Sequence, residues 1–168
     1  MFLESLSSFF LDPEHKRTKE FLAGLPIFKG LGRMDFVHLM QVLQDRTYLK
    51  DEIIFNEGDI GRALFIVLSG RVHIKRKTED GEVVLATVNA GEIFGEMALL
   101  EEMPRTASAV AAEKAQVFML YKCRLDSLLY EHPSIGVVVI HYLAQTLSAR
   151  LRATIEHRKE DADSPEQK

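Results

Sequence analysis

The chain has 168 residues, a hydrophobic share of 46% and a formal net charge of −4 at pH 7. This length favours one domain with short extensions, and the hydrophobic share is enough for a real core. The negative charge argues against a general nucleic-acid binder, which usually presents a basic face. No apolar run reaches the roughly 18 residues needed to span a bilayer, and the single cysteine, Cys123, excludes an internal disulfide. We therefore expect a cytoplasmic protein that has neither nucleic acid nor a membrane as a partner.

Residues 1–24 are predicted to form a helical extension. Apolar residues of segment 2–11 recur on one helical face. Asp12 is a suitable N-cap and Pro13 a suitable first residue for a second helix, which reaches about Ala23 and stops at Gly24. The favoured interpretation is that this pair of helices packs on the domain. An oligomer contact or a membrane-surface anchor is the alternative, and the absence of Lys and Arg from segment 2–11 argues against an anchor.

The middle of the chain is predicted to form short strands. A short helix over Arg33–Gln44 comes first, with Gly32 as an allowed N-cap. From Asp45 to Tyr121 the apolar residues alternate or form short runs, with glycines and polar pairs between them, which indicates an antiparallel barrel or sandwich. The run from Leu64 to Leu68 is continuous and should form a central strand. The predicted strands are Ile53–Phe55, Ala63–Leu68, Arg71–Lys77, Val83–Val88, Ser108–Val110 and Gln116–Tyr121.

A helical period returns after Tyr121. The spacing predicts one helix that ends before His132 and a long helix from Pro133 to about Arg158, followed by a polar, disordered tail over 159–168. The expected fold class is α+β: an antiparallel β-roll, or jelly-roll-like barrel, flanked by N-terminal helices and two C-terminal helices. The domain itself is assigned to residues 25–158.

Residues 91–109, GEIFGEMALLEEMPRTASA, contain the candidate chemistry. A helix beginning at Glu96 would expose backbone N–H groups that attract an anion, and Gly95 before it would let a ligand approach the backbone. Arg105, after Pro104, supplies a planar fork that matches two phosphate oxygens. Each of these residues alone has an ordinary structural explanation, in a turn, a helix terminus or a surface ion pair. Together they predict a site for a single phosphate.

Glu96 adds a second requirement to this site. A carboxylate beside a bound phosphate repels it, unless a group that donates a hydrogen bond lies between them. A ribose 2′-hydroxyl is such a group. The segment therefore predicts a ligand with one phosphate and a nearby sugar hydroxyl.

The segment resembles the phosphate-binding cassette of the cyclic nucleotide-binding domain family, roughly F-G-E-hydrophobic-A-L-hydrophobic-x-x-x-P-R-x-A. The match runs from Phe94 to Ala107, and the turn glycines also fit a β-roll. The resemblance implies that backbone amides after Gly95 bind the cyclic phosphate, that Glu96 holds the ribose and that Arg105 pairs with the phosphate. The implied ligand-binding residues are Phe94, Gly95, Glu96, Met97, Ala98, Arg105, Thr106, Ala107, Ile74 and Leu85.

The same resemblance implies a regulatory module that binds cAMP, with cGMP as the alternative, and that needs no cofactor or metal. In the family a residue of the last long helix often caps the base. The candidates here are Ile140, His141, Leu143, Ala144 and Leu147. The tail after the long helix is too short for a helix-turn-helix. The output would therefore pass to an unidentified effector protein, or through a homodimer along the 133–158 helix.

Two other functions need weighing. A cupin-type metalloenzyme would cluster histidines with a carboxylate, but the six histidines of this chain are dispersed and no His-x-His pair exists. We therefore do not expect an enzyme. An interaction scaffold that kept the fold and lost the ligand is the remaining alternative, although a scaffold has no need for Gly95, Glu96 and Arg105 together.

Overall fold

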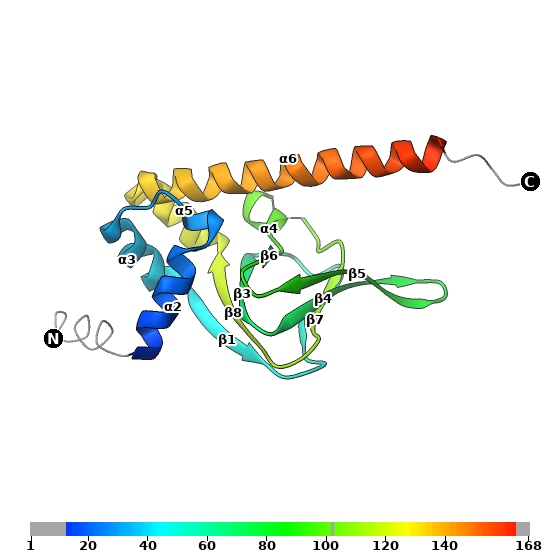
Figure 1. Ribbon diagram of the computed structural model, residues 1–168, viewed down its shortest axis with the longest axis horizontal. Helices are drawn as coiled ribbons and strands as arrows, with labels where there is room; N and C mark the ends of the chain where they lie inside the picture. Colours follow the sequence, from blue (N-terminus) through cyan, green and yellow to red (C-terminus); the bar gives the residue numbers. More distant parts are fainter. Residues whose placement is uncertain (1–12, 102, 164–168) are drawn as a thin grey trace, which may run out of the picture.

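The computed structural model describes residues 13–101 and 103–163. The strands form a β-roll of two antiparallel sheets, and helices lie at both ends of the chain (Figure 1). The predicted segment 2–11 and its cap Asp12 lie outside the described residues. None of the described helices is both long and apolar enough to cross a bilayer.

Eight described strands make up the roll. One sheet has the order β1-β8-β3-β6 and the other β2-β7-β4-β5, so consecutive strands β3 and β4 belong to different sheets. The turn at Gly70, which has a φ of 79°, carries the chain from one sheet to the other. The bounds are β1 Gln44–Tyr48, β2 Ile53–Phe55, β3 Ala63–Ser69, β4 Arg71–Thr78, β5 Gly81–Asn89, β6 Ile93–Phe94, β7 Ser108–Ala111 and β8 Ala115–Tyr121.

The six predicted strands are all present, and two further strands were missed. Strand β1, with the sequence QDRTY, buries only Tyr48 and therefore shows no apolar alternation. Strand β6 has two residues, which is too short for any periodic signal. Strand β1 also explains why the predicted helix 33–44 ends early, because α3 (Arg33–Val42) gives way to extended chain at Leu43.

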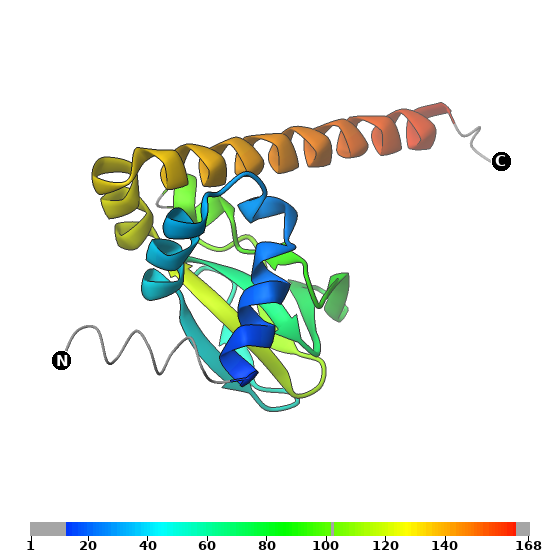
Figure 2. The same ribbon diagram turned by 60° about the vertical axis from the view of Figure 1, so that its left-hand side comes forward.

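Helices cover one sheet and one end of the roll. The first ones are α2 (Pro13–Ala23), the 3₁₀ turn η1 (Pro26–Phe28) and α3, and they gather beside α5 (Lys122–Glu131). Helix α4 (Met97–Leu100) lies between the roll and α6 (Pro133–Asp163) (Figure 1). Helix α6 runs along one side of the roll, and its C-terminal part extends past the strands in Figure 2. The predicted start of α2 at Pro13, its end at Ala23 and the end of α5 before His132 are confirmed.

Two hydrophobic clusters account for the continuous burial of β3. Successive strand residues point to opposite faces. Leu64 and Ile66 pack in a cluster with the helices, whereas Phe65 and Val67 pack inside the roll with Val72 of β4. Both faces of β3 are therefore covered, and its residues 63–67 are all buried. The predicted central position of this strand, between β8 and β6, is confirmed.

Helix α6 is longer than predicted. It continues to Asp163, so the first five residues of the tail expected to be disordered are helical. The sequence also predicts an apolar stripe on this helix that extends past what one roll can cover, through Leu143, Leu147, Leu151 and Ile155. Leu143 is fully buried, whereas Leu151 and Ile155 are 62% and 46% exposed. The helix packs on the core through its first half, and residues 148–156 are exposed.

Candidate functional site

A cavity of about 900 Å³ lies between the roll, the segment around α4 and the second half of α6. Its size is in the range of small-molecule sites. All ten predicted ligand-binding residues line it, together with residues that were not predicted. Ile74 comes from β4, Leu85 from β5, Phe94 from β6, and the other seven from the segments on either side of residue 102.

The Arg105 side chain crosses the inner wall of this cavity. Its guanidinium donates hydrogen bonds to the carbonyl oxygens of Gly95, at 2.9 Å, and Ala63, at 2.8 Å. It also lies over the ring of Phe55, with Cζ 4.1 Å from the centroid, and within 5.7 Å of Phe65. These contacts use two of the five N–H donors of a guanidinium. The side chain is thus fixed in place while donors remain for an anion.

Burial lowers the pKa of Arg105 below its ordinary value, and the charges of Glu96 and Asp59 partly oppose this shift. Desolvation disfavours the charged form, but arginine still carries its charge at neutral pH. A half-buried cation in contact with neutral carbonyls and aromatic rings remains attractive to an anion. This is the electrostatic property that a phosphate site needs.

The backbone of Arg105 is also fixed. Its N–H donates to the carbonyl of Asp59 at 2.8 Å, and its carbonyl accepts from the N–H of Gly58 at 2.9 Å. The loop between β2 and β3 thus binds both peptide groups of this residue. This arrangement explains why Pro104 can precede Arg105, because neither of these bonds requires an N–H from the proline.

Two glycines make room for the guanidinium. Gly95 has a φ of +70°, and a Cβ there would lie 2.7 Å from Arg105 Nη1. A Cβ on Gly61 would lie 2.6 Å from Ala98 Cβ and 3.1 Å from Arg105 Cζ. Sequence reasoning linked Gly95 to the approach of a ligand, but in the structure the nearest group is the arginine of the chain itself. The role of Gly61 was missed, because it lies 44 residues before Arg105 in the sequence.

Glu96 is buried, with 3% of its surface exposed, and forms an ion pair with Arg150 of α6. A buried carboxylate without a partner is costly, so the contact stabilises the charge. Arg150 also lines the cavity and was not predicted. The available signal was the need of a buried carboxylate for a cation, but 54 residues separate the pair and the sequence offered many candidates.

The turn after Gly95 is short. Helix α4 has four residues, and Glu96 occupies its N-cap position in the helical region. The N–H of Ala98 already bonds the Gly95 carbonyl at 3.4 Å, and that of Leu99 bonds the Glu96 carbonyl at 3.0 Å. Of the three amides expected to reach a phosphate, the Ala98 amide therefore has a weak internal partner. The amides of Glu96 and Met97 precede the first such bond.

The residues of α6 over the cavity lie further along the helix than expected. They are Arg150, Ala153 and Thr154. None of the five residues proposed as caps of a base lines this cavity, and Leu143 belongs to the core. The axial rise of a helix accounts for this difference, because the α6 residues that line the cavity lie about one to four turns beyond those candidates.

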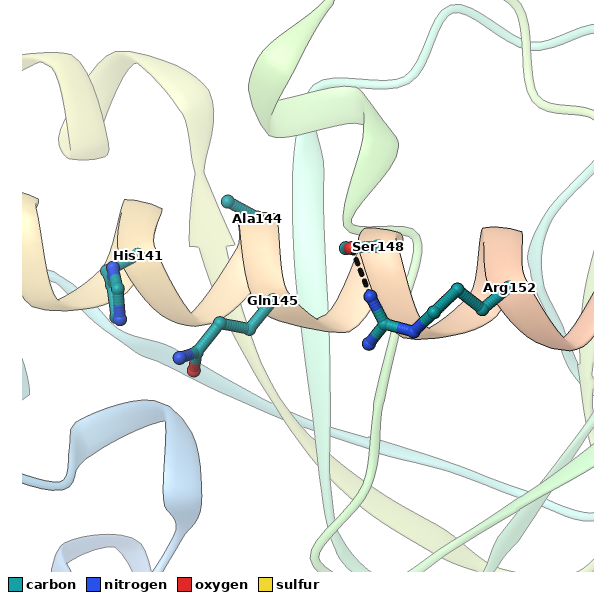
Figure 3. Close-up of a pocket in the computed structure, with 5 residues that line it drawn as sticks. All are labelled: His141, Ala144, Gln145, Ser148 and Arg152. Carbon is teal, nitrogen blue, oxygen red and sulfur yellow. Dashed lines mark hydrogen bonds between the residues drawn. The ribbon is translucent and has the colours of Figure 1, made fainter.

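Two of those candidates, His141 and Ala144, line a second hollow on α6 instead. It has a volume of about 470 Å³, and Gln145, Ser148 and Arg152 complete its lining. All five side chains belong to one helix, and Arg152 donates to the Ser148 hydroxyl at 2.8 Å (Figure 3). A hollow bounded by one helix is an open surface. This hollow is therefore a candidate contact face rather than an enclosed ligand-binding site.

Among the described residues, no group of three or more His, Cys, Asp or Glu side chains is placed to hold a metal ion.

Residues 45–132 match the family model of the "Cyclic nucleotide-binding domain". This match includes the cassette from Phe94 to Ala107 and the strands on either side of it. It excludes α6, which supplies Arg150.

The chain is also similar to individual proteins. It is 39% identical over 132 residues to the "Cyclic AMP receptor protein" of Thermus thermophilus, covering 78% of this chain and 59% of that protein. A solved cyclic nucleotide-binding domain from Methylobacillus flagellatus aligns with a TM-score of 0.75 at 27% identity, over 95% of this chain and 97% of that one.

A third relative is an enzyme. "Glutaminase 1" of Bradyrhizobium diazoefficiens is 36% identical over 137 residues, which make up 82% of this chain but 21% of the enzyme. The chain thus spans less than two thirds of the length of these curated relatives. The similarity concerns the shared domain.

Proposed function

The chain belongs to the cyclic nucleotide-binding domain family, and we propose that it is a regulatory module that binds cAMP in the cavity described above. One observation supports this most: a half-buried Arg105 and a buried Glu96 line the same cavity. A phosphate would pair with the guanidinium, and a sugar hydroxyl would donate to the carboxylate. A cyclic nucleotide carries both groups on adjacent parts of one molecule.

The proposal assigns residues that line the cavity to three parts of the ligand. Arg105 and the amides at the start of α4 bind the phosphate, with Thr106 and Ala107 beside them. Glu96 receives the ribose 2′-hydroxyl. Ile74 and Leu85 pack against the sugar and base, and Ala153 and Thr154 of α6 replace the earlier candidates as the cap of the base. A 2′-deoxy analogue of cAMP should then bind more weakly than cAMP, and equal affinities would remove Glu96 from this role.

The preference for cAMP over cGMP is the finer part of the proposal. The phosphate and ribose contacts are common to both nucleotides, so these contacts give no preference. The name of the Thermus thermophilus relative, "Cyclic AMP receptor protein", supports cAMP. Competition calorimetry with both nucleotides measures the preference directly. An affinity for cGMP equal to or above that for cAMP would contradict it.

A ligand-free scaffold is the second candidate, and one observation favours it. Both side chains have partners within the chain, because Arg105 bonds two carbonyls and Glu96 pairs with Arg150. Thermal denaturation separates the two functions. A ligand at 100 times its dissociation constant should add about 2.7 kcal/mol to the free energy of unfolding. If neither cAMP nor cGMP raises the melting temperature at millimolar concentration, the scaffold is the better description.

The output of the module is proposed to pass through α6. A ligand shifts an equilibrium only by its differential affinity for two states. The Glu96–Arg150 pair gives α6 a direct contact with the proposed sugar site. A bound ribose would therefore change the interactions of this helix. The effector protein that responds is not identified, and we propose a cytoplasmic, non-enzymatic setting for the chain.

A homodimer along α6 is a further proposal, on a face that shares Val137, Ala144, Leu151 and Ile155 with the predicted apolar stripe. Six exposed residues follow each other at alternating steps of four and three, the spacing of a coiled-coil seam. Three of them are apolar with 46% to 62% of their surface exposed, and small residues between them allow close approach. The six residues are Val137, His141, Ala144, Ser148, Leu151 and Ile155.

Light scattering after size exclusion tests this dimer. Leu151→Lys should convert a dimer to a monomer. Met34→Lys places the same charge at a residue that is 66% exposed on α3 and should leave the mass unchanged. A monomeric wild type, with and without cAMP, would exclude the dimer.

A further inference from the structure

Arg76 of β4 lies beside the proposed phosphate site without lining it. Val72 of β4 is buried in the roll and Ile74 lines the cavity. Arg76 is exposed and follows Ile74 by two residues, the spacing of side chains on one face of a strand. The pairing of β4 with β5 continues past Arg76 to Thr78 and Gly81, and the hairpin that these strands form extends outward from the roll (Figure 1). Arg76 thus occupies the rim of the cavity.

The Arg76 side chain holds the peptide that follows Arg105. The pairing of β4 with β7 ends at Lys75 and Ser108. One residue further along β4, Arg76 donates from Nε and Nη2 to the Thr106 carbonyl, at 3.3 Å and 3.2 Å. The side chain continues the connection between the two strands where their backbone ladder has stopped.

This contact fixes the direction of a second group. The carbonyl and the N–H of a trans peptide point in opposite directions within one plane. Arg76 draws the Thr106 carbonyl toward itself, and the N–H of Ala107 is therefore directed to the other side. The Arg105 carbonyl is likewise bound, by the N–H of Gly58. Two carbonyl oxygens that would repel an anion are thus held by donors.

The charge of Arg76 is also available. Its hydrogen-bond partner is the neutral carbonyl of Thr106. The described part of the chain places no carboxylate in ion-pair contact with it. Arg71, at the other end of the same strand, differs in this respect, because it forms an ion pair with Glu113 at 3.1 Å. An unpaired surface cation beside a charged site raises the rate of association with an oppositely charged ligand.

We infer that Arg76 is a positioning residue of the anion site: it orients the Thr106–Ala107 peptide, and its unpaired charge attracts the phosphate of the incoming ligand. This inference rests on the proposed function, because it concerns the same ligand. It adds a residue outside the cassette, on a strand whose other contribution to the cavity is apolar.

The test measures binding kinetics of cAMP by surface plasmon resonance at low and high salt. Arg76→Gln removes the charge and the two-pronged contact, so the affinity should fall about 5- to 20-fold. Its association rate should also lose part of the salt dependence seen for the wild type. Arg76→Lys keeps the charge, so it should retain the association rate and dissociate several times faster.

Arg71→Gln is the matched control, because it makes the same change in net charge on the same strand. It should bind cAMP within about twofold of the wild type, and circular dichroism should show that all three variants are folded. An Arg76→Gln variant that also binds within about twofold, with the salt dependence of the wild type, would overturn the inference. If the wild type binds neither cAMP nor cGMP, the proposed function fails and the inference fails with it.

Discussion

Arg105 carries the most demanding prediction, because the structure gives it both a binding role and a structural one. Arg105→Ala would leave the ligand phosphate without its cation in a partly desolvated cavity. Truncating one partner of such a charge pair costs about 2–5 kcal/mol of binding free energy. At about 1.4 kcal/mol per factor of ten, cAMP affinity should fall by tens to thousands of fold.

The same substitution should lower stability. It removes two charge-assisted hydrogen bonds, to the carbonyls of Gly95 and Ala63, and the contact with the Phe55 ring. A hydrogen bond to a charged group contributes about 1.5–3 kcal/mol and a cation–π contact about 0.5–2 kcal/mol. Relief from the cost of burying the cation offsets part of this. We expect a net loss of about 1–4 kcal/mol in the free energy of unfolding.

Titration calorimetry and urea denaturation, measured on the same preparation, separate the two effects. Arg71→Ala is the control, because that side chain is exposed, pairs with Glu113 and does not line the cavity. Measuring affinity at a temperature where Arg105→Ala is folded removes the contribution of stability. A folded Arg105→Ala variant that binds cAMP within about twofold of the wild type would refute the assignment of the phosphate site.

Arg105→Lys extends this test to pH. Burial lowers the pKa of the native guanidinium, and the same desolvation should lower the pKa of a lysine at this position. The variant should therefore lose cAMP affinity as pH rises through the pKa of that lysine. The affinity of the wild type should stay level over the same range, because arginine remains protonated. A level profile for the variant would show that the site does not desolvate its cation.

Three further predictions concern other parts of the molecule. Arg150→Gln should lower the melting temperature of the ligand-free protein more than Arg152→Gln on the same helix, because it leaves a buried carboxylate without its cation; equal shifts would contradict this. Gly61→Ala should cost about 1–3 kcal/mol of stability and weaken cAMP binding, since its Cβ would lie 2.6 Å from Ala98 Cβ. A melting temperature equal to that of the wild type would show that the site can widen to accept the methyl group. Burial raises the pKa of Tyr48 above 10.0. The stability that the protonated hydroxyl contributes is therefore complete below pH 10 and is lost as pH rises through the folded-state pKa. Tyr48→Phe should reduce the fall in the free energy of unfolding over this alkaline range, and an unchanged slope would contradict the prediction.

The roll and its helices could largely be predicted because their signals are local. Alternation and short apolar runs identified six strands, and Pro13 and Pro133 marked the first residues of two helices. The failures have the same origin. Strand β1 is polar along most of its length and is held by its pairing with β8. It therefore carries no pattern by which a single sequence could identify it.

The candidate site also has a part that local sequence signals predicted and a part that they did not. A contiguous segment with a glycine, an acid and an arginine, and its resemblance to a family cassette, predicted eight of the residues that line the cavity, because their spacing along one loop already places them near each other. The sequence by itself therefore determined the cassette and the class of ligand it suits. It did not determine the partners that these residues find.

Tertiary structure alone decided those partners. Arg150 meets Glu96 across 54 residues, Gly61 makes room for Arg105, and Arg76 reaches the Thr106 carbonyl from another strand. Such contacts depend on how far along α6 the cavity falls and on where the ladder between β4 and β7 ends. Both are properties of packed elements in space. No residue pattern along the chain predicts these contacts. Charge and size limit which residue types can pair, but many residues of the same type are present and the sequence does not show which of them pairs.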